Sequence, residues 1–184
     1  MTLALRVPTG FVLLIGAVMS LAQTAEQTPE PRDVRIHARE DFEFVADGAI
    51  DRVFPLFGSE MERAWAAGWD PRFVWPAPAE DREGMVFRVA QLGRTATWIN
   101  TVFDRDAHRV QYVYVLPDVV ATVITLKLTP CAGSTHVTVR YDRTSLSVEA
   151  DAMVRGMARH DAAAGPEWGA QINRYLAASA RTGP

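Results

Sequence analysis

The strongest constraint on the fold is a series of short apolar segments, separated by turn signals, between residues 84 and 142. Five strand-like segments follow one another there: 84–92, 95–103, 109–116, 119–128 and 136–142. The turns between them are short, and Gly93-Arg94 has the composition of a hairpin turn. Because consecutive strands joined by short turns pair with each other, the pattern predicts an antiparallel meander.

Two further strands and a helical segment are expected before the meander. Segment 36–45 largely alternates polar and apolar residues, which is typical of a strand with one buried face. Apolar residues at helical spacing predict a short helix over 49–57. Segment 73–76 is a short aromatic strand, and Pro76 places it at a sheet edge because proline cannot donate to a ladder. The total is seven strands.

A second short helix is expected over residues 59–68. Trp65 falls at helical spacing with other apolar residues, whereas Glu62 is expected on the solvent side. Ser59 and Glu62 also match the capping-box pattern of a helix N-terminus. Three of the five tryptophans, Trp65, Trp69 and Trp75, lie within eleven positions. Such a cluster indicates either a core centre or the rim of a ligand cavity.

The C-terminal part, residues 148–178, has the periodicity of a long helix. Its predicted apolar stripe consists of Met153, Met157, His160, Ala164, Trp168, Ile172 and Tyr175. Gly165-Pro166 must kink or restart this helix.

Charged residues in the strands indicate which side chains point inward. Arg88, Lys127 and Arg140 mark the solvent faces of their strands. The inward-facing residues are then Met85, Phe87, Val89, Ile124, Leu126, Leu128, Val137, Val139 and Tyr141. Strands 95–103 and 109–116 are apolar or neutral on both faces, so their inward face stays undecided.

Several segments together resemble START-like (SRPBCC, helix-grip) proteins of the bacterial polyketide cyclase/dehydrase type. They are ERAWAAGWDPRFVWP with EGMVF, TWINTVFD, HVTVRYDRTSLS and EWGAQINRYL. The resemblance covers about residues 36–178. It implies an α+β helix-grip fold, in which a curved seven-stranded antiparallel sheet wraps around a long C-terminal helix, with two short helices after the first strand. Such folds commonly leave a cavity between sheet and helix.

The N-terminus has the pattern of an export signal. Arg6 precedes an apolar run over 11–21, and small residues at 20 and 22 favour cleavage after Ala22. An uncleaved anchor is the alternative, although the run is short for a membrane span. We therefore expect a signal peptide over 1–22, a flexible linker over 23–35, the domain over 36–179 and a disordered tail over 180–184. The mature protein would be periplasmic or secreted, with no stable membrane span.

Composition excludes several kinds of partner. A net charge of −3 gives no basic surface for nucleic acid. The single Cys131 cannot form an intramolecular disulfide, and no histidine–carboxylate spacing indicates a metal site. No glycine-rich phosphate loop is present, and we expect no cofactor.

The predicted cavity residues are mostly aromatic. They are Trp65, Trp69, Trp75, Phe87, Trp98, Asn100, Tyr112, Tyr114, Tyr141, Met157, His160 and Trp168. Each tryptophan could equally be core filling, and His160 could be a core-edge residue bonded to backbone. Asn100 needs a partner if it faces inward. Asp142-Arg143 is expected to be a surface pair. No catalytic set of nucleophile, base and orienting residue is evident.

Three functions are compatible with this sequence. The first is binding of an apolar or amphipathic small molecule, or a lipid, in the cavity. The second is a cyclase or hydrolase in which His160, Tyr141 or Asn100 transfers protons in the same cavity. The third is an envelope interaction protein with a filled core. The missing catalytic set favours binding.

Overall fold

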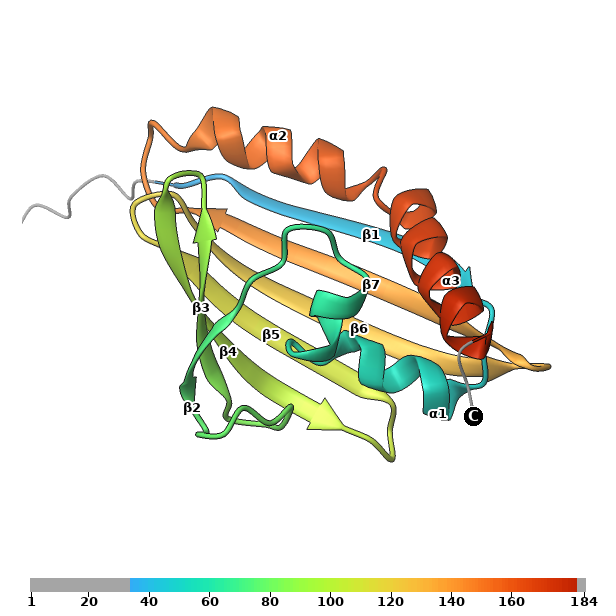
Figure 1. Cartoon of the computed structure of the whole chain (residues 1–184). Coiled ribbons are helices and arrows are strands. Elements are labelled where there is room, and N and C mark those ends of the chain that lie inside the picture. The colour runs from blue at the N-terminus through green and yellow to red at the C-terminus, as the bar shows by residue number, and fades with distance from the viewer. Residues whose placement is uncertain (1–33, 182–184) are drawn as a thin grey trace, which may run out of the picture. The chain divides into compact units, whose positions relative to one another are not determined.

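The computed structural model describes residues 34–181, which form a seven-stranded antiparallel sheet with helices on its concave side (Figure 1). The strands are β1 (His37–Ala46), β2 (Arg72–Trp75), β3 (Val86–Gln91), β4 (Arg94–Asp104), β5 (Arg109–Leu116), β6 (Val120–Cys131) and β7 (Ser134–Ser145). Their order is β1-β7-β6-β5-β4-β3-β2, so the predicted meander is confirmed and β1 closes it by pairing with β7. β2 lies at the opposite edge, as Pro76 predicted.

The two C-terminal helices cover the part of the concave face formed by β1 and β7. α2 (Asp151–Asp161) packs on β1 and β7, and α3 (Gly165–Arg181) packs on β1. The segment after β1 forms α1 (Ile50–Val53), followed by two 3₁₀ turns, η1 (Phe54–Phe57) and η2 (Met61–Ala64). Figure 1 shows α1 at the same end of the sheet as α3. This arrangement confirms the predicted helix-grip fold. Within residues 34–181, no helix is both long and apolar enough to cross a membrane.

The predicted segments at the chain ends fall mostly outside this description. The predicted signal peptide over 1–22 lies outside the described residues, and so does the linker up to residue 33. At the other end, α3 continues to Arg181, so residues 180 and 181 are helical and do not belong to the predicted tail. Residues 182–184 are not described.

Side chains alternate between the two faces of the sheet as the charged residues predicted. The predicted inward residues of β3, β6 and β7 are buried, apart from Tyr141, which is partly buried. The structure also decides the two ambiguous strands. The inward residues of β4 and β5 are Ala96, Trp98, Asn100, Val110, Tyr112, Tyr114 and Leu116. Their strands carry apolar residues on both faces, so only pairing with neighbours could set the register.

The hairpin turn between β3 and β4 lies one residue earlier than predicted. Leu92 and Gly93 both have positive φ, 49° and 72°, whereas Arg94 already begins β4. A two-residue turn with positive φ at both positions matches the right-handed twist of the paired strands. Leu92 therefore adopts a left-handed backbone conformation that leucine does not favour.

The long C-terminal helix is two helices, and the first presents a different face from the one predicted. In α2 the buried residues are Val154, Ala158 and Asp161, whereas Met153 and His160 are exposed. Each buried residue of α2 thus lies one position after a residue of the predicted apolar stripe. Small side chains there let α2 approach the sheet closely, and the burial of Asp161 depends on an ion pair described below.

The second predicted short helix is replaced by the single turn η2 and an irregular segment. Met61 and Gly68 are exposed, and Trp65 and Trp69 instead anchor the segment. The indole of Trp65 donates to the Leu56 carbonyl at 2.7 Å, and that of Trp69 donates to the Ser59 carbonyl at 2.8 Å. These two hydrogen bonds of the tryptophans fix the position of the segment. The helix that apolar spacing predicted over residues 59–68 was therefore wrong.

Two glycines bring α3 close to β1. A Cβ atom at Gly165 would lie 2.7 Å from the backbone oxygen of Glu43, which is closer than van der Waals contact allows. A Cβ at Gly169, one turn later, would lie 3.3 Å from the Cβ of Phe44. Small residues four positions apart therefore let the backbones of α3 and β1 meet.

We predict that Gly165→Ala lowers the free energy of unfolding by about 1–3 kcal/mol, because the added methyl group forces α3 away from β1. The matched control is Gly156→Ala in α2, where the nearest atom, Nη2 of Arg159, would be 3.8 Å from the new Cβ. This control should raise stability by about 0.5–1 kcal/mol through helix propensity. Urea unfolding of both variants measures the difference, and equal effects would contradict the close packing.

Candidate functional site

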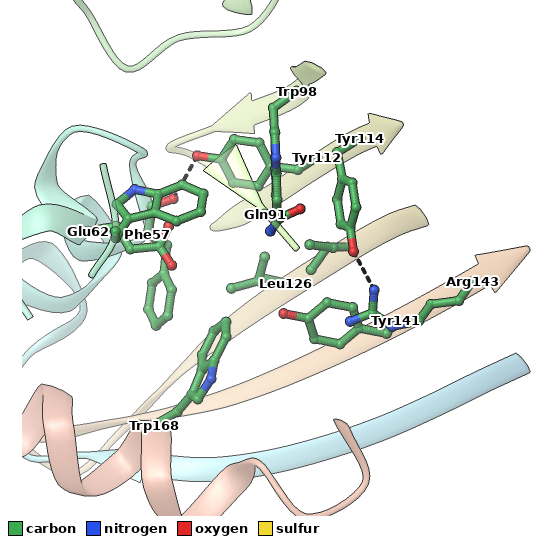
Figure 2. Close-up of a pocket in the computed structure, with 12 residues that line it drawn as sticks. Phe57, Glu62, Gln91, Trp98, Tyr112, Tyr114, Leu126, Tyr141, Arg143 and Trp168 are labelled. Carbon is green, nitrogen blue, oxygen red and sulfur yellow. Dashed lines mark hydrogen bonds between the residues drawn. The ribbon is translucent and has the colours of Figure 1, made fainter. Parts of the chain in front are cut away.

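A cavity of about 210 Å³ lies between the concave face of the sheet and the helical segments (Figure 2). Most of the side chains around it are aromatic or aliphatic, and three are polar or charged. The lining residues are Phe57, Glu62, Trp69, Gln91, Trp98, Tyr112, Tyr114, Ile124, Leu126, Tyr141, Arg143 and Trp168. They come from the segment 57–69, from β3 to β7 and from α3, so most elements of the domain contribute to the cavity.

Six predicted cavity residues line this space: Trp69, Trp98, Tyr112, Tyr114, Tyr141 and Trp168. Their rings pack in contact with one another. Trp98 stacks on Tyr114 with centroids 4.2 Å apart, and Trp69 meets Trp98 edge-on at 5.3 Å. Packed rings of this kind hold each other in place, so they form a rigid wall.

Two predicted residues lie behind this wall. Phe87 is fully buried and packs against both Trp69 and Trp98. Trp65 is buried and meets Trp168 edge-on at 5.5 Å. Both residues support the lining without reaching the cavity.

Three predicted residues lie away from the cavity, and a fourth lies near it. Trp75 is 47% exposed on the edge strand, with Arg82 over its ring. His160 is exposed on α2, and Asn100 is completely buried behind the lining. Met157 borders a neighbouring pocket that shares Tyr114 and Arg143 with the main cavity. His160 and Asn100 are therefore not placed to transfer protons in the cavity, which corrects that part of the enzyme hypothesis.

Asn100 is nevertheless unusual. Within residues 34–181, neither its side-chain nitrogen nor its oxygen has a hydrogen-bond partner, and the same is true of Nε1 of Trp98. Buried amides are usually bonded, so Asn100 weakens the core locally. We expected Asn100 to need a partner if it faced inward, but the described part of the chain provides none.

Arg143 lines the cavity and was not among the predicted site residues. It is 7% exposed and makes a bidentate pair with Asp161 of α2, at 2.5 Å from Nε to Oδ2 and 2.9 Å from Nη2 to Oδ1. Its Nη1 also donates to the Tyr114 hydroxyl at 2.5 Å and to Thr122 at 3.2 Å. Its guanidinium lies 4.5 Å from the ring centroid of Tyr141.

This network corrects the prediction of an Asp142–Arg143 surface pair. Asp142 instead accepts a hydrogen bond from Arg39 of β1, on the outer face of the sheet. Adjacent strand residues point to opposite faces, so Arg143 had to turn inward when Asp142 turned outward. Burial opposes the charge on Arg143, but the hydrogen bonds to Asp161 hold the pKa of the guanidinium above its usual value. Arg143 therefore stays charged.

Glu62 is a second lining residue that the sequence analysis did not predict, because we expected its side chain on the solvent side. It lies on η2 and contributes to the cavity wall, on the opposite side from Arg143 in Figure 2. Within the described residues, no group donates a hydrogen bond to its carboxyl. Burial, and then the charge of Asp81, raise the pKa of Glu62 from 4.5 to about 8. The carboxyl is thus poised to change its protonation state near neutral pH.

Asp81 belongs to the loop between β2 and β3 and holds the start of η2. Its carboxylate accepts bonds from the Ser59 hydroxyl at 3.2 Å and from the Glu60 amide at 3.1 Å. A Cβ at Gly58 would lie within 2.0 Å of this carboxylate, so the loop sits directly on the Gly58 backbone. Asp81, and not the predicted Ser59–Glu62 capping box, therefore fixes the segment that carries Glu62.

Two tyrosines of the lining on which Glu62 acts electrostatically, Tyr112 and Tyr141, stay neutral. The Tyr112 hydroxyl donates to the Phe57 carbonyl at 2.9 Å, and burial raises the pKa of Tyr112 well above its usual value. Burial likewise raises the pKa of Tyr141. In Figure 2 the Tyr141 hydroxyl points toward the cavity. The described residues contain no group of three or more histidine, cysteine, aspartate or glutamate side chains that could hold a metal ion.

We predict that Asp161→Asn lowers the free energy of unfolding by about 3 kcal/mol, because Arg143 is left buried without a counter-charge. The control is Asp142→Asn, which breaks a pair whose arginine is 58% exposed and should cost less than about 1 kcal/mol. Denaturant unfolding of the two variants tests this difference. Equal losses would mean that the buried pair has no special role.

We predict that Glu62→Gln becomes increasingly stabilising as pH rises from 5 to 9. The native state of the wild type holds a proton on Glu62 up to about pH 8, whereas the unfolded chain loses it near 4.5. The stability from this proton is complete below 4.5 and is lost as pH rises through 8. Relative to the wild type, the variant should gain roughly 2 kcal/mol over this range, less than the full shift implies because the carboxyl faces the cavity. Urea unfolding at several pH values measures it, and Glu83→Gln, an exposed loop residue, should show no such trend.

Comparisons with known proteins agree with this architecture. The chain matches no protein-family model and no curated protein sequence. Among solved structures, it is similar to norcoclaurine synthase from Thalictrum flavum, with a TM-score of 0.60, 9% identity, and coverage of 95% of this chain and 100% of that one.

Two further structures are similar. Ara h 8.0201 has a TM-score of 0.55 and 12% identity, over 77% of this chain and 99% of that chain. An uncharacterised protein from Rhizobium leguminosarum has a TM-score of 0.55 and 20% identity, over 77% of this chain and 95% of that chain. Identities this low show the fold alone. The chain thus has a Bet v1/START-like helix-grip fold.

Proposed function

We propose that this domain binds a small, mainly apolar molecule that contains a ring, in the cavity between the sheet and the helical segments. The observation that carries the proposal is an unfilled space of about 210 Å³ with an aromatic lining. Apolar cavities with a few polar groups are the usual form of small-molecule sites. A protein with a filled core, the interaction hypothesis, would have no such space.

The cavity volume limits the ligand. A protein cavity of about 150 Å³ is large enough to hold benzene. A space of about 210 Å³ therefore suits a single ring with a short substituent. A lipid with a long acyl chain would need more room, so a small ring-containing molecule is the better candidate of the two kinds of ligand that the sequence suggested.

The structural comparison supports a ligand of this size. The structure of norcoclaurine synthase has been solved in complex with dopamine and hydroxybenzaldehyde, both single-ring molecules. The sequence resemblance to polyketide cyclase/dehydrase-type proteins also favours a ring-containing ligand.

A second candidate function is catalysis of proton transfer on the bound molecule. One observation favours it: Glu62 faces the cavity with a pKa of about 8, close to the pH at which a general acid or base is most effective. A binding protein would release its ligand chemically unchanged, whereas an enzyme would convert it. Incubating the purified protein with the ligand identified below separates the two functions.

The test of binding is native mass spectrometry of the protein isolated from its own host, followed by denaturation and identification of any released molecule. We expect a stoichiometric small molecule. Leu126→Trp, which fills the cavity from β6, should abolish this mass increment, whereas Val123→Phe on the outer face of the same strand should keep it. An increment that persists in Leu126→Trp would place the ligand elsewhere. The intact mass also tests the proposed export signal, since cleavage after Ala22 removes residues 1–22.

A further inference from the structure

The charges around the cavity are unevenly compensated. Glu62 and Arg143 are the charged residues in its lining. Arg143 is neutralised by its bidentate pair with Asp161, and three of its nitrogens already donate hydrogen bonds. The side-chain carboxyl of Glu62 accepts no hydrogen bond from residues 34–181. On one side of the cavity a ligand therefore meets a cation whose hydrogen bonds and counter-charge are already provided. On the other side it meets an acid whose carboxyl has no hydrogen-bond donor.

The surroundings of Glu62 disfavour a second anion. Asp81 acts on Glu62 electrostatically and raises its pKa. A carboxylate ligand beside Glu62 would be repelled by the charge of both acids, and the guanidinium of Arg143 is already engaged with Asp161. A bound cation would instead be attracted by both acids, in a space where burial strengthens each interaction.

The aromatic lining also favours a cation. The negative faces of tryptophan and tyrosine rings attract ammonium groups, most strongly where water is excluded. Trp69, Trp98 and Trp168 line the cavity with Glu62. Rings around a carboxylate combine apolar contact for a ligand's body with charge recognition for one end of it.

We propose that the ligand of this cavity carries a protonated amine, with Glu62 as its ion-pair partner and the aromatic side chains around its apolar part. This inference rests on the proposed function, because it names the chemical class of the molecule bound there.

A proton should leave the protein when such a ligand binds. The unliganded Glu62 keeps its proton up to about pH 8, but an ion pair with ammonium requires the carboxylate. The groups that interact electrostatically with Glu62 are Asp81 from the loop before β3, Tyr112 from β5 and Tyr141 from β7. Both tyrosines stay neutral in this range, and Arg143 stays charged. Between pH 6 and 7, the affinity for an amine should therefore rise about tenfold.

The experiment is isothermal titration calorimetry of the whole protein with three probes of one shape: 2-phenylethylamine, the neutral 2-phenylethanol and the anionic 3-phenylpropanoate. Titrations at pH 6, 7 and 8, in buffers with different ionisation enthalpies, count the protons released. We expect the amine to bind most tightly at pH 8, with about one proton released at pH 7. Glu62→Gln should weaken amine binding at least tenfold at pH 8 and abolish proton release, yet keep the affinity for 2-phenylethanol. The control Glu83→Gln should bind all three probes like the wild type.

The results separate this inference from the proposed function. If 2-phenylethanol or 3-phenylpropanoate binds as tightly as the amine, or if Glu62→Gln binds the amine unchanged, the amine inference is wrong and the binding function stands. If none of the three probes binds at millimolar concentration, the amine inference is wrong, and the binding function is wrong as well if native mass spectrometry finds no bound molecule.

Discussion

The concave face of the sheet is the constraint on which the rest of this structure depends. An antiparallel sheet with one apolar face must cover that face, and α2 and α3 cover only the part formed by β1 and β7. The remaining part, from β3 to β6, is closed by large side chains and by the segment that carries Trp65 and Trp69. The cavity forms because the sheet is wider than the two helices that cover it.

The ion pair between Arg143 and Asp161 shapes both packing and chemistry. It joins β7 to the last turn of α2 and lets α2 bury an acidic residue on its sheet-facing side. It also removes the positive charge that would otherwise dominate one side of the cavity. Glu62 then remains as the uncompensated group of the lining. The electrostatic preference of the site therefore depends on a residue of α2 that does not line the cavity.

The position of Glu62 depends in turn on its neighbours. The two indole hydrogen bonds of Trp65 and Trp69 anchor the irregular segment after η1, and Asp81 holds the beginning of η2. These contacts turn Glu62 toward the cavity, although its place in the sequence favours solvent. The same Asp81 also makes the charged form of Glu62 costly. One loop residue thus both positions the acid and adjusts its pKa.

The sequence by itself determined the antiparallel meander, the edge position of β2 and the inward faces of β3, β6 and β7. These features depend on local alternation and on turn residues, which are properties of short segments. It also identified six of the aromatic residues that line the cavity, because aromatic side chains in a small domain gather at its centre. Only the tertiary structure decided the inward faces of β4 and β5, the buried face of α2 and the roles of Glu62, Arg143 and Asp161. A buried charge is stable only beside a partner that is distant in the sequence, and Arg143 and Asp161 meet only when α2 folds onto β7.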